Sequence, residues 1–119
     1  MSYKRGDIVV TKFPFIMKEG SERQKGRPSL VISDHKVIKR YRDVVFAAIT
    51  SHIPMDIMEM EIILEPVKET GLVKKSLLRL DFIMTIPEEL ISRRIGELSE
   101  NIMKEVESKL EKLFKINAS

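Results

Sequence analysis

The chain has 119 residues, a formal net charge of +3, no cysteine and only two histidines. This length suits one domain over residues 1–119. The absence of cysteine excludes disulfides, thiolate metal sites and cysteine nucleophiles. Neither histidine has a partner at metal-ligand spacing, so we expect no metal and no cofactor. No apolar run reaches the roughly 18–20 residues that span a bilayer, and the N-terminus lacks the apolar core of a signal peptide, which predicts a cytoplasmic protein without membrane contact.

Short strands are predicted in the first half of the chain. Apolar residues from Ile8 to Phe13 indicate a first strand. The segment from Pro14 to Gly26 is polar and contains glycines, and a loop of this length usually binds a ligand or is disordered. Leu30 to Ser33 and Val44 to Ile49 form the next two predicted strands, on either side of a basic turn over residues 36–42.

Two further strands are predicted in the second half. Residues 58–65 alternate between apolar and mostly acidic side chains, which indicates a half-buried strand. Residues 76–81 alternate again, and Met84 to Ile86 can continue this fifth strand. The alternation places Leu78, Leu80 and Phe82 on one side of the fifth strand, and Leu77, Arg79 and Asp81 on the other.

The chain is predicted to end in a helix. Pro87 to Leu90 suits the opening turn of a short helix, with carboxylates near its positive end. Ser99 can cap a longer helix from Glu100 to Phe114, whose single apolar stripe indicates packing against a core. Five short strands, long polar loops and a terminal helix predict a mainly β fold, a small closed or nearly closed antiparallel barrel covered by the C-terminal helix.

Polar side chains stand at the ends of two predicted strands. Arg27 precedes Pro28, and because proline fixes its own φ and pushes the preceding residue toward extended geometry, the guanidinium is held at a rigid strand entrance where it suits a phosphate. The third strand ends in Thr50, Ser51 and His52, which offer hydroxyls and an imidazole. We therefore expect the two strand ends to form one site.

Positive charge is concentrated in the first third of the sequence. Residues 1–42 carry 11 Lys and Arg against 4 Asp and Glu, whereas residues 43–119 carry 10 against 14, so the front is +7 and the back is −4. Such an asymmetry favours a polyanion as partner of the front. A solvated basic loop with no partner is the alternative.

The loop from Pro14 to Gly26 carries residues suited to single-stranded nucleic acid. Arg23 and Lys25 would make salt-dependent phosphate contacts, and Phe15 would stack on an unpaired base. Glu22 would act as a base or order Arg23, and a solvated loop charge is an equal alternative.

The chemistry of RNA cleavage without metal matches several of these side chains. The neighbouring 2′-hydroxyl attacks the phosphorus, and the site must supply a base, an acid and stabilisation of charge on the phosphorane. Arg27 suits the last role, because a guanidinium binds two oxygens at once and stays protonated. Thr50 would hold the phosphate or orient the 2′-hydroxyl, or it is simply a strand-favouring residue. His52 is a candidate base, or a solvent-facing loop histidine.

Several blocks of the sequence resemble, in order, the MazF/PemK family of toxins from toxin–antitoxin pairs. The blocks that carry the resemblance are Arg5–Val9, Phe13–Phe15, Gly20–Glu22, Arg27–Ser33, Ala48–Ser51, Gly71–Leu72 with Ser76–Asp81, and Arg94–Ser99. Together they cover nearly the whole chain.

The resemblance implies an SH3-like barrel, a cytoplasmic homodimer, and metal-independent endoribonuclease activity on single-stranded mRNA that inhibits translation and growth. It also implies neutralisation by a small, acidic cognate antitoxin, and DNA binding by the toxin–antitoxin complex. The family's catalytic arginine and threonine fall on Arg27 and Thr50. The RNA-binding residues are expected to be Phe15, Glu22, Arg23, Lys25, Pro28, Ser51 and His52.

The pattern departs from the family at Phe82 and Met84, where many members carry polar residues. Two alternatives therefore stay open. One is a protein-binding toxin on the same barrel, similar to the CcdB gyrase poison, which cuts no bond. The other is a catalytically degenerate homologue that only regulates its operon.

Overall fold

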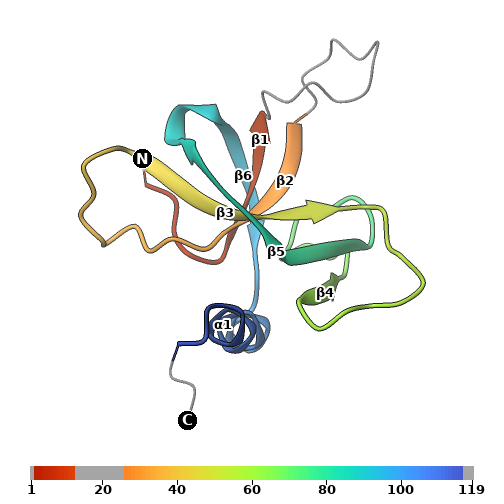
Figure 1. The fold of residues 1–119 in the computed structure, drawn as a ribbon. Helices are drawn as coiled ribbons and strands as arrows, with labels where there is room; N and C mark the ends of the chain where they lie inside the picture. The colour runs from red at the N-terminus through yellow and green to blue at the C-terminus, as the bar shows by residue number, and fades with distance from the viewer. Residues whose placement is uncertain (1, 13–25, 117–119) are drawn as a thin grey trace, which may run out of the picture.

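The fold is described here from a computed structural model, which describes residues 2–12 and 26–116 (Figure 1). The predicted RNA-contacting residues of the long loop lie outside the described residues: Phe15, Glu22, Arg23 and Lys25. The end of the first predicted strand, at Phe13, also lies outside them.

Six strands and one α-helix make up the described chain, so the predicted mainly β fold with a C-terminal helix is confirmed. The elements are β1 (Asp7–Lys12), β2 (Gly26–Val31), β3 (Asp43–Thr50), β4 (Glu61–Leu64), β5 (Ser76–Pro87), the short 3₁₀ turn η1 (Glu88–Leu90), β6 (Ile91–Glu97) and α1 (Glu100–Phe114). The helix begins as predicted, since the Ser99 hydroxyl accepts the Ile102 N–H at 3.3 Å.

Two strands begin at other residues than predicted, and a third strand was not predicted. β2 begins at Gly26 rather than Leu30, because Gly26 to Pro28 already pair with β1. β4 begins only at Glu61, because the preceding residues form a turn in which the Glu61 N–H donates to the Met58 carbonyl at 3.1 Å. β6 was not predicted as a strand, since only Ile91 and Gly96 of its seven residues are buried and they follow no period of two.

The six strands form one antiparallel sheet in the order β4-β5-β3-β2-β1-β6. Within the described residues β4 and β6 do not pair, so the sheet is not closed and the fully closed barrel is corrected to a nearly closed one. The loop after β4 still reaches β6, where the Glu97 N–H donates to the Glu69 carbonyl at 2.8 Å. A loop contact therefore replaces the last strand pair.

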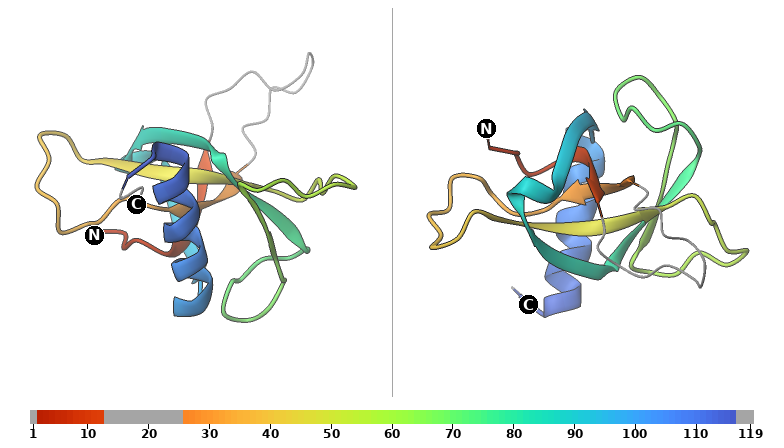
Figure 2. Two further views of the ribbon diagram at one scale, coloured as in Figure 1. Left: turned by 60° about the horizontal axis from the view of Figure 1, so that its bottom comes forward. Right: turned by 90° about the horizontal axis from the view of Figure 1, so that it is seen from above.

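Apolar side chains form two clusters that hold the sheet in this shape. The larger cluster joins residues of five strands, including Leu30, Leu78 and Leu80, to the fully buried Val106 of α1. Figure 2 shows α1 lying across the sheet on one side. The smaller cluster gathers around the fully buried Phe46. Among the described residues, no helix has both the length and the apolar character needed to cross a membrane.

Two glycines let the loop after β4 lie directly on the backbone of β6. A Cβ at Gly96 would stand 2.4 Å from the carbonyl oxygens of Glu69 and Thr70. A Cβ at Gly71, whose φ is +69°, would stand 2.0 Å from the carbonyl oxygen of Ile95. Because backbone atoms cannot move aside as a flexible side chain can, only glycine fits at either position.

Replacing Gly96 by alanine should therefore destabilise the fold. We expect Gly96→Ala to lower the free energy of unfolding by about 1–3 kcal/mol, the usual cost of overpacking, in urea unfolding followed by circular dichroism. Val73→Ala, in the same loop and 92% exposed, is the control and should change stability by less than about 0.5 kcal/mol. Equal stability of the two variants would show that the loop is not pressed onto β6.

Candidate active site

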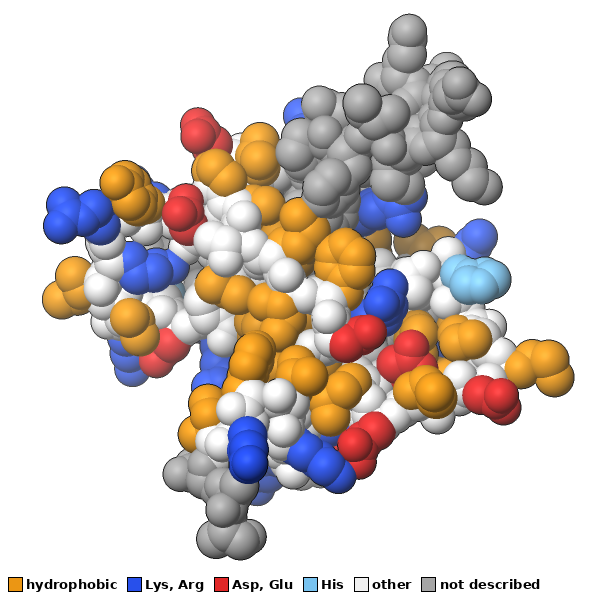
Figure 3. Space-filling model, viewed as in Figure 1, with side chains coloured by type: hydrophobic (Ala, Val, Ile, Leu, Met, Phe, Trp, Pro, Cys, Tyr) orange, Lys and Arg blue, Asp and Glu red, His pale blue; other side chains and the backbone are white. Residues whose placement is uncertain are grey.

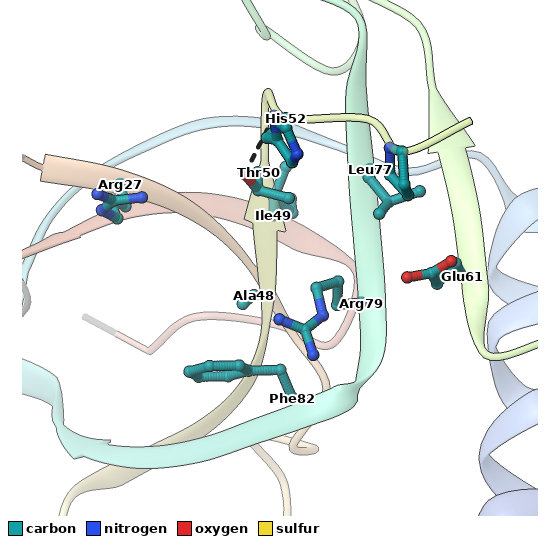
Figure 4. Close-up of a pocket in the computed structure, with 10 residues that line it drawn as sticks. Arg27, Ala48, Ile49, Thr50, His52, Glu61, Leu77, Arg79 and Phe82 are labelled. Atoms are coloured by element: carbon teal, nitrogen blue, oxygen red, sulfur yellow. Dashed lines mark hydrogen bonds between the residues drawn. The ribbon is translucent and has the colours of Figure 1, made fainter. Parts of the chain in front are cut away.

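The ends of β2 and β3 and the middle of β5 enclose a cleft of about 390 Å³ (Figure 4). Its walls are partly apolar, with the buried side chains of Ile49 and Leu77, and partly polar. The residues that line it are Arg27, Ala48, Ile49, Thr50, His52, Pro54, Glu61, Leu77, Arg79 and Phe82. The sequence prediction that Arg27, Thr50 and His52 come together is thus met by the geometry.

The register of the sheet explains why Arg27 and Thr50 meet. In the β2–β3 pair, Ser29 lies opposite Ala48 and Leu30 opposite Ala47. Continued by two residues, this antiparallel register sets Arg27 across from Thr50, and residues that lie opposite each other share a face of the sheet. Figure 4 shows Arg27 on β2 and Thr50 on the neighbouring β3.

Arg27 is the second residue of β2, close to the strand entrance where it was predicted, and Thr11 of β1 lies opposite it. Pro28 is tolerated in the next position because β2 pairs with β3 only from Ser29 onward, so the proline stands where the strand is still open on one side. Pro28 itself is half-buried and, of the described residues, is not one that lines the cleft. A direct contact of Pro28 with RNA stays a prediction.

Buried hydroxyls hold the backbone of Arg27 from the β1 side. Thr11 Oγ1 donates to the Arg27 carbonyl oxygen at 3.3 Å, and it lies 3.4 Å from Ser29 Oγ. Both hydroxyl side chains are fully buried. Since Thr11 uses its hydrogen on Arg27, Ser29 donates to Thr11, and the two hydroxyls form a short chain beneath the cleft. Sequence reasoning missed this support.

Thr50 has its hydroxyl fixed by the turn that follows β3. The His52 N–H donates to Thr50 Oγ1 at 3.1 Å, drawn as the dashed line in Figure 4. A hydroxyl that accepts from this N–H keeps its own hydrogen to donate toward the cleft. The exposed His52 side chain lines the cleft, whereas Ser51, also exposed, is not among the described residues that do.

A bulge in β5 brings Phe82 into the cleft, although the alternation of the sequence predicted this residue on the other side of the strand. Ala47 lies opposite Ile83, but Ala48 lies opposite Arg79, so three residues of β5 between them face no partner on β3. Such a bulge breaks the period of two and re-aims side chains. Phe82, predicted on the side of Leu78 and Leu80, therefore lines the cleft together with Arg79.

Arg79 is held in place by its neighbours in the bulge. Its Nε and Nη2 donate to the two carboxylate oxygens of Asp81 at 3.2 Å and 3.0 Å, and its guanidinium carbon lies 5.3 Å from the centroid of the Phe82 ring. The hydrogen bonds to Asp81 are the main cause that raises the pKa of Arg79, with smaller contributions from the charges of Asp81 and Glu61. Arg79 is thus a fixed cation.

Sequence reasoning missed Arg79 and Glu61 as lining residues. Glu61 lies opposite Arg79 in the β4–β5 pair, and its Oε1 accepts the Met58 N–H at 2.8 Å. The sequence did place Arg79 on the polar side of the fifth predicted strand. It could not show which strands lie beside that strand, so it could not show that this side faces the cleft. Within residues 2–12 and 26–116, no group of three or more metal-ligating acidic or histidine side chains was found.

The chemistry of the cleft suits a phosphodiester. The guanidiniums of Arg27 and Arg79, a directed hydroxyl and an imidazole border it beside the Glu61 carboxylate. Arg79 is bonded to Asp81, so Arg27 is the guanidinium that suits a pair of phosphate oxygens. The partly apolar walls lower the local dielectric and strengthen such contacts. The arrangement can bind a phosphate at Arg27 and Thr50 and leaves room beside it for the rest of a nucleotide.

Comparison with known proteins identifies the family of this chain. Residues 4–114 match the family described as the PemK-like, MazF-like toxin of type II toxin–antitoxin systems. A probable endoribonuclease MazF of Mycolicibacterium smegmatis is 30% identical over 100 residues, which are 84% of this chain and 85% of that protein.

Solved structures show the same fold. Toxin MazF-mt6 of Mycobacterium tuberculosis superposes with a TM-score of 0.72 at 22% identity, over 93% of this chain and 98% of that one. The MazE–MazF structure (Form-II) from Deinococcus radiodurans gives 0.74 at 19% identity, over 97% of both chains. Because the family match spans residues 4–114, nearly the whole chain, the chain belongs to the PemK-like, MazF-like toxins of type II toxin–antitoxin systems, as its sequence blocks indicated.

Proposed function

We propose that this member of the PemK-like, MazF-like toxin family is an endoribonuclease that cuts single-stranded RNA at the cleft between β2 and β3. The observation that carries the proposal is the meeting of Arg27 and Thr50, which are far apart in sequence but line one cleft. The relative named as a probable endoribonuclease supports the same activity. The residue roles follow from the chemistry of the two side chains.

In the proposed reaction the 2′-hydroxyl of the nucleotide loses its proton to water as its oxygen attacks the adjacent 3′-phosphorus. The bond to the 5′-oxygen of the next nucleotide breaks, and this oxygen takes a proton from water. The products are a 2′,3′-cyclic phosphate and a 5′-hydroxyl. Arg27 binds the non-bridging oxygens and stabilises the charge that develops on the phosphorane. Thr50, whose hydroxyl is oriented by the His52 N–H, donates to a phosphate oxygen and fixes the phosphorus in line with the attacking oxygen.

The proposed partners follow from charge and family. A small acidic antitoxin would cover the basic front of the chain, where residues 1–42 carry 11 Lys and Arg against 4 Asp and Glu, and compete there with RNA. An endoribonuclease from a mycobacterial species, whose fold is similar, has been solved in complex with its cognate antitoxin. We also propose that the protein is cytoplasmic and forms a homodimer. Sedimentation at micromolar concentration would test the dimer.

Purified protein should cut a single-stranded RNA in excess EDTA, and Arg27→Ala should slow this cleavage by roughly 10²–10³-fold. The products should carry a 2′,3′-cyclic phosphate and a 5′-hydroxyl, read by mass spectrometry. Arg93→Ala is the matched control, because Arg93 is an exposed arginine on β6 that does not line the cleft. It should keep near-normal cleavage.

Two results would count against this proposal. Loss of all cleavage on chelation would refute the metal-independent mechanism, and normal turnover of Arg27→Ala would place the site elsewhere. A wild-type protein that cuts no RNA at all would instead favour a toxin that binds a protein.

His52→Gln should be tolerated within about tenfold, because the turn uses the backbone N–H of residue 52 to orient Thr50 and any side chain supplies that group. Single-turnover cleavage measured from pH 5 to 8 should therefore show no step that depends on this histidine. A loss beyond about a hundredfold with RNA binding unchanged would make His52 the base.

Charge reversal at Arg23 and Lys25 should weaken both RNA and antitoxin, because both ligands are polyanions expected over the same loop. The matched control reverses Lys68 and Lys74, which are exposed, give the same change of net charge and do not line the cleft. Fluorescence titration at two salt concentrations measures both ligands. Equal effects of the two double variants would show that only net charge matters.

A further inference from the structure

Phe82 is an aromatic side chain kept at the mouth of the cleft. It belongs to neither apolar cluster, and 37% of its surface is exposed. A ring that does not contribute to either cluster and borders a binding cleft is available to a flat, apolar part of a ligand. In a cleft proposed to hold RNA, that part is a nucleobase.

Arg79 fixes the position of this ring. The guanidinium lies over the Phe82 ring at 5.3 Å and is itself clamped by both carboxylate oxygens of Asp81. A guanidinium with two parallel hydrogen bonds is restricted in orientation, so the ring beside it is also restricted. Because the ring is ordered before a ligand binds, less conformational entropy is lost when one stacks on it.

Arg79 is less suited to the alternative role of a second phosphate ligand. The Nε and Nη2 groups of Arg79 already donate to Asp81. The negative charge of the Asp81 carboxylate also balances the positive charge of Arg79. A phosphate would have to compete with that carboxylate. The contact with Phe82 is therefore the use of Arg79 that the geometry favours.

The ring lies at the right place for a base next to the reacting phosphate. Arg79 is opposite Ala48, two residues from Thr50 on the same strand, which is about 7 Å at the usual rise of a strand. Figure 4 shows the Phe82 ring beside the Arg79 head, in the cleft that Thr50 also lines. A phosphate at Thr50 and a base at Phe82 would thus share one cleft.

We propose that Phe82 is a stacking platform for the base adjacent to the cleaved bond, and that Arg79 is the positioning residue that holds it. This inference rests on the proposed ribonuclease function. A phenyl ring offers no hydrogen bond to a base edge, so selection at this position comes from stacking strength. Purines, with the larger ring system, should be preferred there over pyrimidines.

The test begins by mapping the cleaved bond in a natural RNA. A short single-stranded oligonucleotide with that sequence is then made uncleavable by removing the attacking 2′-hydroxyl, and carries 2-aminopurine on one or the other side of the bond. Stacking on an aromatic ring quenches 2-aminopurine fluorescence. The variants are Phe82→Leu, which keeps apolar bulk without a π face, Phe82→Tyr, which keeps the ring, and Arg79→Lys, which keeps the charge without the planar fork.

Wild-type protein and Phe82→Tyr should quench one of the two probes, and Phe82→Leu should not. The ratio of kcat/KM for a purine over an abasic residue at that position should fall roughly five- to a hundredfold in Phe82→Leu. Arg79→Lys should lower the same ratio in the wild-type background and have little further effect in Phe82→Leu. Other positions of the RNA should be unaffected by either change.

Cleavage of unmodified RNA separates failure of this inference from failure of the proposed function. If Phe82→Leu cleaves RNA with the wild-type purine-to-abasic ratio and still quenches the probe, the platform is refuted while the ribonuclease stands. If the wild-type protein neither cleaves nor binds the RNA, both proposals are overturned. If Arg79→Lys acts equally in both backgrounds, Phe82 is the platform but Arg79 does not position it.

Discussion

The antiparallel register between β2 and β3 is the constraint on which the site depends. Backbone pairing from Ser29 to Val31 with Phe46 to Ala48 determines which residues stand beside each other at the open ends of the two strands. A slip of one residue would send Arg27 to the opposite face of the sheet from Thr50. The fully buried Leu30 and Phe46 prevent this slip, because each would leave its cluster. Core packing therefore sets the geometry of the polar site.

The cleft combines a rigid side with an irregular one. On the rigid side, Thr11 and Ser29 hold the backbone of Arg27 through buried hydroxyls. On the irregular side, the bulge of β5 turns Phe82 toward the cleft, next to Arg79, which still pairs with Ala48. This division suits the proposed nuclease. The regular strands place Arg27 and Thr50, the groups proposed to act on the phosphate, and side chains in the bulge can be exchanged without disturbing the sheet. It also explains how the departure at Phe82 is compatible with an intact fold.

Much of this arrangement was predictable from the sequence, for physical reasons that also explain the failures. Strong periodicity identified α1 and the first half of β5, an apolar run identified β3, and the Arg27-Pro28 and Thr50-Ser51 pairs indicated the site. β6 was missed because its exposed residues follow no period of two. Phe82 was put on the wrong side because a bulge depends on strand pairing that alternation cannot reveal. Arg79 was overlooked because its neighbour Ala48 belongs to a strand distant in sequence, and the sequence does not show that the two strands pair.

The central claim is that Arg27 and Thr50 act on one phosphate as a unit, and a double-mutant cycle tests it most directly. Single-turnover cleavage is measured for Arg27→Ala, Thr50→Val and the double variant, with folding checked by thermal unfolding. Groups that act together lose most of their effect when either is removed, so the double variant should be slowed little more than the slower single variant. A double variant slowed by the full product of the two single effects would contradict the account, because Arg27 and Thr50 would then act independently.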